Sequence, residues 1–454
     1  MERKIDLTKG DILLTLTKLA IPIMGTSFMQ MAYNLTEMFW VGRSGSDAVA
    51  AVGTAGFFMW FGFSLILISK SGAEVFVAQY LGRKDEEGAK EHAVSAIQLN
   101  LFIAAVYGML IIIFRHQLIS FFRLGDQHVI DMAVSYLLVI GSGIFFNFMN
   151  PVFTGIFNGA GLSKVPFRFN FIGLITNMIL DPLLIYGIGP LPGMGVTGAA
   201  VATVTAQLAV TVLFIVHIRN RKEAYFRLNI FRRPSLHHIK KIIRLGMPVS
   251  LQNGFFAMIA MVVARIIAVY GPEAIAVQKV GSQIESLSWM TAGGFSTALS
   301  AFVGQNYGAK EYDRIVKGYR SGVLAVSGLG FLSMIMLMVF PKQLFGIFIQ
   351  EPETIRMGAS YLWILGLSQV FMSIEISNQG AFNGLGRTKI PSYVGIFFNA
   401  LRIPGAYLLS TYSTLGLDGV WWTISISSVF KGLVLFALFR IMVLKPYRAS
   451  GTIR

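Results

Sequence analysis

The chain has 454 residues, of which 54% are hydrophobic and only 13% are charged, and its mean hydropathy is +0.64. This composition excludes an ordinary water-soluble fold, because soluble domains carry about 25% charged residues. The absence of cysteine excludes disulfides, thiolate metal sites and cysteine nucleophiles. The net charge of +16 does not indicate nucleic acid binding, because Lys and Arg lie in the short gaps between apolar runs, where membrane topology explains them.

Apolar runs recur along the whole chain. A bilayer span needs about 20 apolar residues, so a chain of this length has room for about a dozen spans. The runs cover approximately residues 12–41, 48–81, 93–114, 129–160, 166–188, 195–217, 245–270, 273–307, 320–340, 356–382, 391–412 and 416–444. We expect every run to be a helix. The polar start, residues 1–10, and the lack of a small-residue cleavage site predict that no signal peptide is removed.

Basic residues are concentrated in alternate gaps. One set of gaps, which includes both termini and the central linker, carries 27 Lys and Arg residues, against five in the other set. The rich set includes Arg3, Lys4, Lys222 and Arg454. Because positive loops stay inside, we expect both termini in the cytoplasm and a multi-pass protein of the plasma membrane.

The two halves of the sequence resemble each other. K-L-A-I-P at 18–22 matches R-L-G-M-P at 244–248, and F-V-A-Q-x-x-G at 76–82 matches F-V-G-Q-x-x-G at 302–308, both 226 positions apart. F-N-G-x-G at 157–161 matches the same motif at 382–386. An even number of helices per half makes the repeat parallel about an axis normal to the membrane. We therefore predict an all-α integral membrane protein of twelve transmembrane helices in two six-helix bundles: an N-terminal lobe (1–217), a basic cytoplasmic linker (218–243) and a C-terminal lobe (244–454).

These repeats, together with the early Pro22 and Pro248, Y-N-L-T-E at 33–37 and N-x-x-x-D-P at 177–182, resemble the MATE (multidrug and toxic compound extrusion) cation antiporters over nearly the whole chain. The last two motifs are similar to the DinF-like branch, which implies a cation site in the N-terminal lobe. The acid of the first helix is usually Asp in that pattern and is Glu37 here. The NorM-like branch has an acid at the position of Phe256, so a C-lobe site of that type is not expected.

The residues themselves indicate an ion site in the first half. Ionisable groups are costly in a bilayer, so Glu37 and Asp181 are functional candidates. Asn177 is one helical turn from Asp181, and Thr203 enters from helix six at a similar depth. The oxygens of these four side chains suit a proton or Na⁺.

Polar residues of helix one lie near this candidate site, and its two acids have alternative structural roles. Gln30, Tyr33 and Asn34 are nearby polar residues of helix one, and Pro22 either bends that helix or is a passive kink. Glu37 alternatively extends to the headgroups, and Asp181 alternatively satisfies backbone freed by Pro182.

Further buried charges are predicted to be structural. Lys70 and Glu74, at i and i+4, are expected to form an ion pair. In the second half we expect Arg402 to pair with Glu285 or Glu375, because a buried charge needs a partner. Arg265, Lys279 and Lys431 receive no role from the sequence.

We predict a secondary active efflux antiporter that exports organic, cationic or amphipathic compounds in exchange for H⁺ or Na⁺. The alternatives are a flippase for a lipid-linked precursor and, from a different class, an intramembrane enzyme. The sequence carries no phosphate loop and no zinc-hydrolase spacing, so we expect no cofactor, no resident metal beyond possible Na⁺ at the N-lobe residues, and no enzyme. The expected partners are small organic substrates and the bilayer, with no nucleic acid, and the expected state is a monomer.

Overall fold

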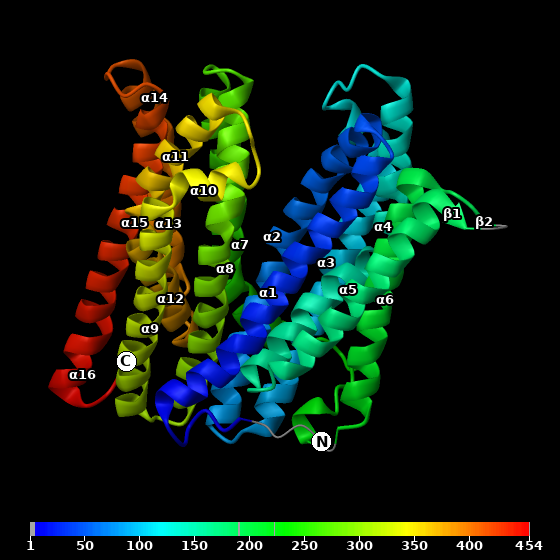
Figure 1. The fold of residues 1–454 in the computed structure, drawn as a ribbon. Coiled ribbons are helices and arrows are strands. Elements are labelled where there is room, and N and C mark those ends of the chain that lie inside the picture. The colour runs from blue at the N-terminus through cyan, green and yellow to red at the C-terminus, as the bar shows by residue number, and fades with distance from the viewer. Residues whose placement is uncertain (1–4, 189–190, 222, 454) are drawn as a thin grey trace. The chain divides into compact units, whose positions relative to one another are not determined.

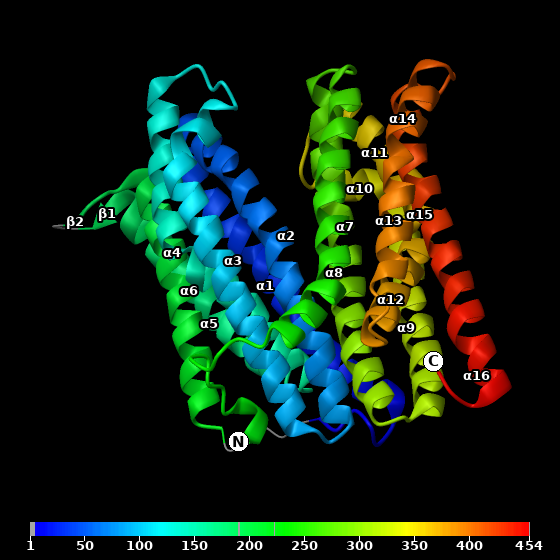
Figure 2. The ribbon, with the colours of Figure 1, turned by 180° about the vertical axis from the view of Figure 1, so that it is seen from behind.

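Helices make up nearly all of the computed structural model (Figures 1 and 2). The structure describes residues 5–188, 191–221 and 223–453. Four of the cations counted for topology, Arg3, Lys4, Lys222 and Arg454, lie outside the described residues.

Six long helices form the first half. They are α1 (Ile12–Arg43), α2 (Ser46–Gly82), α3 (Glu86–Ser120), α4 (Gln127–Gly159), α5 (Lys164–Tyr186) and α6 (Gly195–Arg219). Short strands β1 (Gly187–Ile188) and β2 (Leu191–Pro192) pair antiparallel between α5 and α6, and the 3₁₀ turn η1 (Ala224–Phe226) follows α6. The side chains of Asp85 and Asp126 cap α3 and α4 by accepting hydrogen bonds from backbone N–H groups of their first turns.

The second half contains helices corresponding to the six later apolar runs. They are α7 (Leu236–Ala268), α8 (Pro272–Gly308), α9 (Tyr312–Val339), α10 (Pro341–Gly346), α11 (Pro352–Gly366), α12 (Gln369–Gly384), α13 (Lys389–Ala400), α14 (Arg402–Thr411), α15 (Leu417–Phe439), the π-helical turn η2 (Arg440–Leu444) and α16 (Lys445–Ser450). The helical prediction is confirmed for every run. Two runs expected as single helices are each divided, into α11 with α12 and α13 with α14.

Nine helices of the described chain are long and apolar enough to span a bilayer, and the α11–α12 pair, bent by 50°, makes a tenth candidate. Helix α8 and the α13–α14 pair are not among these candidates. Polar residues such as Gln278, Lys279 and Gln283 lower the hydropathy of α8, although its 37 residues are ample for a span.

The internal repeat is visible in the backbone as well as in the sequence. Left-handed backbone angles recur at equivalent positions: Gly45 and Gly271 (φ 114° and 99°), Lys84 and Lys310 (62° and 63°), Gly161 and Gly386 (79° and 77°), and Gly195 and Gly416 (55° and 53°). These residues lie in the turns that begin or end helices, where a positive φ reverses the chain. The two halves therefore share their connections as well as their helices.

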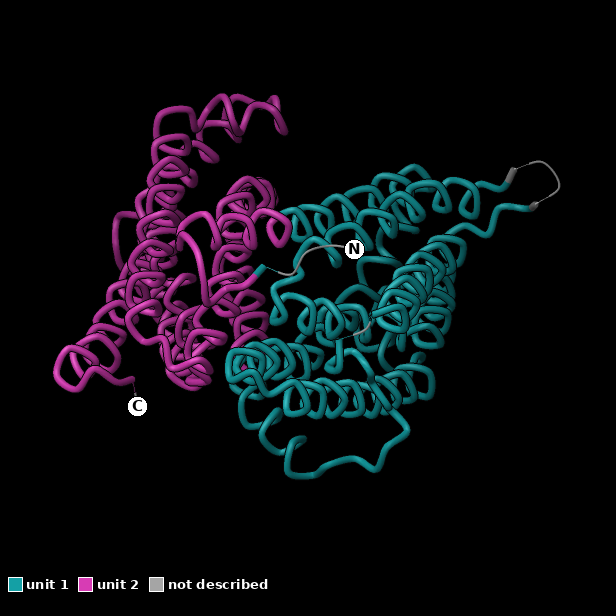
Figure 3. Tube along the Cα trace, turned by 90° about the horizontal axis from the view of Figure 1, so that it is seen from below, with its two compact units in different colours: residues 1–5, 25–250 teal, residues 6–24, 251–454 magenta. Residues whose placement is uncertain are grey.

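The chain folds into two compact units (Figure 3). Unit 1 comprises residues 1–5 and 25–250, and unit 2 comprises residues 6–24 and 251–454. Helices α1 and α7 each contribute to both units, and their crossing points, after Met24 and Ser250, are 226 positions apart. Pro22 and Pro248 lie two residues before these points. The core of unit 1 joins α2, α3, α4 and α6, and unit 2 has its own core around Tyr361 and Trp421.

Close helix contacts in unit 1 depend on glycine. A Cβ at Gly198 would overlap the carbonyl group of Leu184, where α6 approaches the end of α5. We expect Gly198→Ala to destabilise the protein by about 1–3 kcal/mol, because the backbone must shift. Gly53→Ala is the matched control, since nothing lies within 4 Å of the added methyl group on α2. Thermal unfolding in detergent measures both variants, and equal midpoints would show that the α5–α6 contact tolerates the added group.

Candidate functional site

Polar side chains from α1, α4, α5 and α6 come together inside unit 1. The packing that aligns the helices is apolar: Tyr33 of α1 forms a buried cluster with Leu174 of α5 and Ala206 of α6. Near the ends of the same helices, the Tyr186 hydroxyl donates to the carbonyl oxygen of Trp40 at 2.6 Å. These contacts align α1 with α5, and they bring the acids of the two helices to one level.

Glu37 is held by a tyrosine of another helix. The hydroxyl of Tyr136 on α4 donates to Glu37 Oε1 at 2.8 Å, and Tyr136 itself is buried. The Glu37 side chain is half-buried. Its carboxylate therefore has an internal partner, which a side chain extended to the headgroups would lack.

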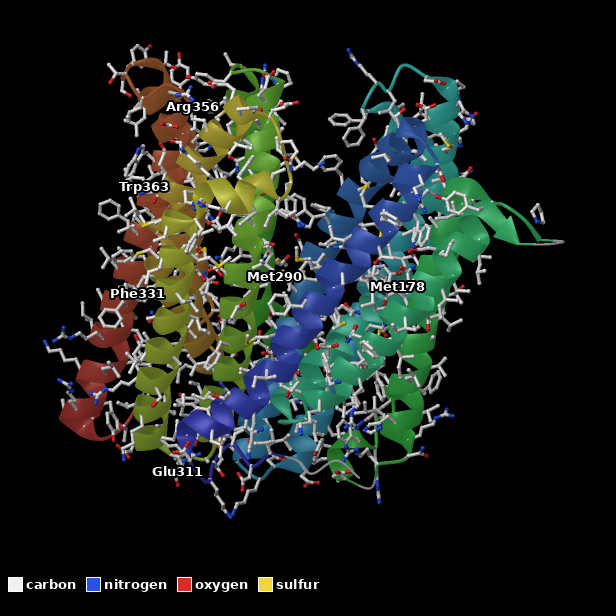
Figure 4. All side chains as sticks on the ribbon, viewed as in Figure 1. Met178, Met290, Glu311, Phe331, Arg356 and Trp363 are labelled. Carbon is white, nitrogen blue, oxygen red and sulfur yellow. The ribbon has the colours of Figure 1, made fainter. Side chains whose placement is uncertain are left out.

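Asp181 is fully buried and has one partner in the described structure. Asn177 Nδ2, one turn earlier on α5, donates to Asp181 Oδ1 at 3.0 Å. Figure 4 labels Met178, the next residue after Asn177, and so marks the level of this turn. The described hydrogen bond of Asp181 is therefore with the Asn177 amide, and not with backbone freed by Pro182.

Four buried oxygens in this region make no hydrogen bond of ordinary length and angle in the described structure. They are Tyr33 Oη, Asn177 Oδ1, Asp181 Oδ2 and Thr203 Oγ1. A buried polar atom without a partner costs about 1–3 kcal/mol, and several of them together mark a place suited to a ligand. We call Glu37, Asn177, Asp181 and Thr203, with Tyr33 and Tyr136, the N-half cluster.

Two predicted neighbours differ from this cluster in burial. Gln30 and Asn34, four residues apart on α1, are both exposed, whereas Tyr33 is buried.

Two residues that the sequence did not single out support the cluster. Tyr136 is one, and Gln207 on α6 is the other: its side-chain and backbone oxygens accept hydrogen bonds from the buried Asn150 of α4. Thr211 donates to Asn150 Oδ1 at 2.8 Å. The spacing of Thr203, Gln207 and Thr211 at i, i+4 and i+8 was the available signal, since it is a polar stripe on an apolar helix.

Tyr136 allows a graded test of the cluster. On the expectation from the sequence that these residues bind the coupling ion, Tyr136→Phe should weaken transport and the apparent affinity for that ion by roughly tenfold or more, because a hydrogen bond to a charged group contributes about 1.5–3 kcal/mol. Transport rates at stepped ion concentrations measure this, with Tyr107→Phe as the control, since the Tyr107 hydroxyl donates to the backbone carbonyl of Phe58 and not to an acid. Equal losses in both variants would indicate a general packing effect.

The second half has a different buried arrangement: Arg402 forms no ion pair within 4.0 Å with Glu285 or Glu375 in the described structure, although the charges of both acids still act on it. The guanidinium of Arg402 donates to the hydroxyls of Ser427 (2.7 Å) and Ser428 (3.1 Å) on α15. The ion-pair partner of Glu375 is Lys431, with Nζ 3.0 Å from Oε1, and both side chains are at most 7% exposed. Arg402 is placed toward α15 because α14 begins at residue 402, after the break from α13.

Glu285 also has neutral partners. Gln369 Nε2 donates to Glu285 Oε1 at 3.0 Å, and the Tyr361 hydroxyl lies 3.4 Å from Oε2. Two acids and two bases thus share the interior of unit 2, and their formal charges balance.

The prediction for α2 also needs correction. Lys70 and Glu74 do not form an ion pair within 4.0 Å in the described structure, although the charge of Lys70 still acts on Glu74. Glu74 is buried where α2 meets α4, and a Cβ at Gly155 would contact both residues. The close approach of α4 occupies the space beside them.

No group of three or more histidine, aspartate and glutamate side chains suited to a metal ion occurs in the part of the chain described. The N-half cluster differs from such a group, since it combines two carboxylates with amide and hydroxyl oxygens. Carboxylate, amide and hydroxyl oxygens are the groups with which proteins bind small hard cations.

Comparison with known proteins identifies the family. The model of the MatE family matches residues 22–183 and 248–408, one match in each half. The probable multidrug resistance protein NorM of Thermotoga maritima is 28% identical over 93% of this chain and 91% of its own length. The probable multidrug resistance protein YoeA of Bacillus subtilis is 27% identical, with 91% and 90% covered.

Solved structures agree with these matches. A MATE crystal structure in the bent conformation superposes with a TM-score of 0.91 over 100% of both chains at 24% identity, which supports the fold. The outward-facing structure of a multidrug resistance MATE family transporter has a TM-score of 0.88, with 97% and 98% covered at 25% identity. With a family match in both halves, relatives over nearly its whole length and the same fold, the chain belongs to the MatE family of multidrug efflux transporters.

Proposed function

We propose that this multi-pass membrane transporter is an antiporter that exports organic, cationic or amphipathic compounds in exchange for H⁺ or Na⁺, with the coupling ion bound in the N-half cluster. Members of its family are transporters, not enzymes, and need no cofactor. The observation that carries the proposal is the set of orphaned oxygens beside two carboxylates in one half of the protein.

The chemistry of the cluster follows from its donors. Glu37 and Asp181 supply negative charge, while Asn177 and Thr203 supply neutral oxygens. A Na⁺ held by these groups, or a proton on either carboxylate, would satisfy the unpaired oxygens and offset the burial of charge. A cationic substrate would compete for the same negative charge, and such competition is what exchange requires.

The second half supports this assignment by contrast. Its buried acids already have partners: Glu375 has the ammonium group of Lys431, and Glu285 has the amide group of Gln369. At Glu375 a coupling cation would have to displace the resident ammonium group of Lys431. The N-half acids have hydrogen-bond donors but no basic side chain among their described partners.

We further propose how the halves serve transport. The N-terminal lobe (1–217) and the C-terminal lobe (244–454), joined by the linker 218–243, rock against each other and expose the substrate alternately to each side, as their parallel repeat favours. The excess of Lys and Arg in alternate loops supports cytoplasmic termini and a location in the plasma membrane. We propose a monomer as the working state, because each chain carries both lobes.

Transport by the purified protein in liposomes tests the proposal. We expect a fluorescent organic cation to be moved against its gradient when an inward H⁺ or Na⁺ gradient is imposed separately, and movement should stop when the effective gradient is removed. Transport that persists without any ion gradient would contradict antiport. Movement of a labelled lipid-linked precursor, without export of the organic cation, would favour a flippase instead.

A further inference from the structure

The segment between α6 and α7 is fastened to unit 1 along its length. Tyr225 and Phe226 are buried, and the Phe226 ring stacks on Phe157 with centroids 4.8 Å apart. The backbone N–H of Ala224 donates to the carboxylate of Glu86 at 3.3 Å. The start of the segment is therefore a fixed part of the lobe rather than a loose tether.

The following turn is braced on both sides of Phe231. Gln98 Nε2 on α3 donates to the carbonyl oxygens of Ile230 (2.9 Å) and Arg232 (2.7 Å). Asn229 Oδ1 accepts the backbone N–H of Phe231 at 3.2 Å, and Arg232 pairs with Glu91 at 3.1 Å. These bonds fix the backbone on either side of Phe231, and the phenyl ring points away from the lobe.

Phe231 is 94% exposed, more than any other large apolar side chain of the described residues, and Leu236 is 79% exposed. Such exposure is costly in water, and here it recurs at two positions of one short, ordered segment. An apolar contact outside the lobe would remove this cost.

The charged residues of the segment itself all have one sign after Glu223. Residues 224–272 contain no Asp or Glu, whereas Arg227, Arg233 and Lys240 are exposed cations of this stretch. The acids beside the segment already have partners: Glu91 pairs with Arg232, Glu223 pairs with Arg221, and Glu86 accepts the backbone N–H of Ala224. The outer side of the segment is thus cationic and apolar together.

The location of this segment between two membrane-spanning helices also restricts what it can contact outside the lobe. Helix α6 ends at Arg219, and the apolar run of α7 begins near residue 245 within a helix that starts at Leu236. The polar start of α7 is therefore about 13 Å long at 1.5 Å per residue, so the segment lies outside the hydrocarbon core and within reach of the bilayer surface on the side where α6 ends.

We propose that residues 227–240, which we call the linker anchor, bind the surface of a bilayer that contains anionic phospholipids: the Arg and Lys side chains contact lipid phosphates, and Phe231 and Leu236 insert at the boundary of headgroups and acyl chains. Apolar side chains flanked by Lys and Arg are the combination that holds a protein segment at such a surface. The anchor would fasten the N-terminal lobe to the bilayer, and its role is independent of the ion bound in the N-half cluster.

The absence of cysteine makes a direct test available. In the full chain, Phe231→Cys provides a single site for an environment-sensitive fluorophore, and the protein is reconstituted in phosphatidylcholine vesicles with or without phosphatidylglycerol. Nitroxide-labelled lipids report contact by quenching. We expect strong quenching in the anionic vesicles and clearly weaker quenching in the neutral ones.

Charge-reversal variants provide the matched comparison. Arg227→Glu, Arg233→Glu and Lys240→Glu together should abolish the difference between the two lipid compositions, and should lower phosphatidylglycerol binding by roughly tenfold or more. Arg440→Glu, Lys445→Glu and Arg448→Glu change three exposed cations elsewhere by the same charge and should leave the label at 231 unaffected.

A second measurement avoids the label. Native mass spectrometry of the unlabelled chain should show fewer retained phosphatidylglycerol molecules after reversal of the three anchor cations than after reversal of the three control cations. The proposal is overturned if the fluorophore stays in water in both vesicles, or if the two reversals lose equal amounts of lipid. Quenching that rises with protein density instead of nitroxide content would also overturn it, because the partner would then be a second copy of this chain.

Discussion

Glu37→Gln and Asp181→Asn are each expected to abolish gradient-driven export while leaving expression and thermal stability near normal. The amide variants keep the volume of the side chains but remove the charge that a coupling ion must neutralise. The loss of export should not be accompanied by a loss of stability, because the native hydrogen bonds can persist. Tyr136 can still donate to an amide oxygen at position 37, and Asn177 can still donate to an amide oxygen at position 181. Export of a fluorescent cation from proteoliposomes, under H⁺ and Na⁺ gradients imposed in turn, measures the loss.

Glu353→Gln is the matched control. Glu353 is an exposed acid that pairs with Arg356 at the start of α11, so its loss should leave transport unchanged. If both N-half variants export at rates close to those of the native chain, the assignment of the coupling site is wrong.

Lys431→Met is expected to cause the largest loss of stability among single substitutions in unit 2. Removal of the ammonium group strands the carboxylate of Glu375, which is 5% exposed and whose other side-chain donor in the described structure is Gln379, at 3.1 Å. Breaking one partner of a buried ion pair costs roughly 3–5 kcal/mol. The thermal unfolding midpoint of the purified protein in detergent measures the loss.

A double variant separates the pair from its surroundings. Lys431→Met with Glu375→Gln should recover much of the lost stability, because neither charge is then unpaired. Lys431→Met with Glu285→Gln is the control and should recover less, since Glu285 is held by Gln369 and Tyr361. Equal recovery in both double variants would mean that the four charges act as one network rather than as the pair described.

Hydropathy and the internal repeat made the helices and the two halves of the fold predictable from the sequence. Twelve apolar runs and the repeat at 226 positions predict the helices and the two halves, because lipid requires every backbone group to be satisfied within a helix. The interruptions after Gly366 and at Leu401 were not predicted. Both lie inside continuous apolar runs, and no proline marks the first one, so hydropathy gives no sign of a break.

Depth along a helix can be read from the sequence, but its rotation against a neighbour cannot. Asn177, Asp181 and Thr203 could be placed at one level from residue counts alone. Tyr136 could not be connected to Glu37, because one residue of error on α4 turns a side chain by about 100°. Its hydroxyl is one of several in apolar helices, and only packing shows that it faces α1.

The charges of the second half illustrate the same limit. Arg402 and Lys431 are both cations within apolar runs, and spacing alone offers Glu285 and Glu375 to either one. The choice depends on the break between α13 and α14, which directs Arg402 to the hydroxyls of Ser427 and Ser428 and leaves Glu375 to Lys431.

The most direct test measures ion binding itself. Sodium bound and protons released or taken up are determined in the same sample of purified protein as an organic cation is added, for the native chain and for variants of each half. We predict that the native chain and the Lys431→Met, Glu375→Gln variant bind a coupling ion that the organic cation displaces, and that the Glu37→Gln, Asp181→Asn variant binds none. Undiminished ion binding in the Glu37→Gln, Asp181→Asn variant would contradict a coupling site in the N-half cluster.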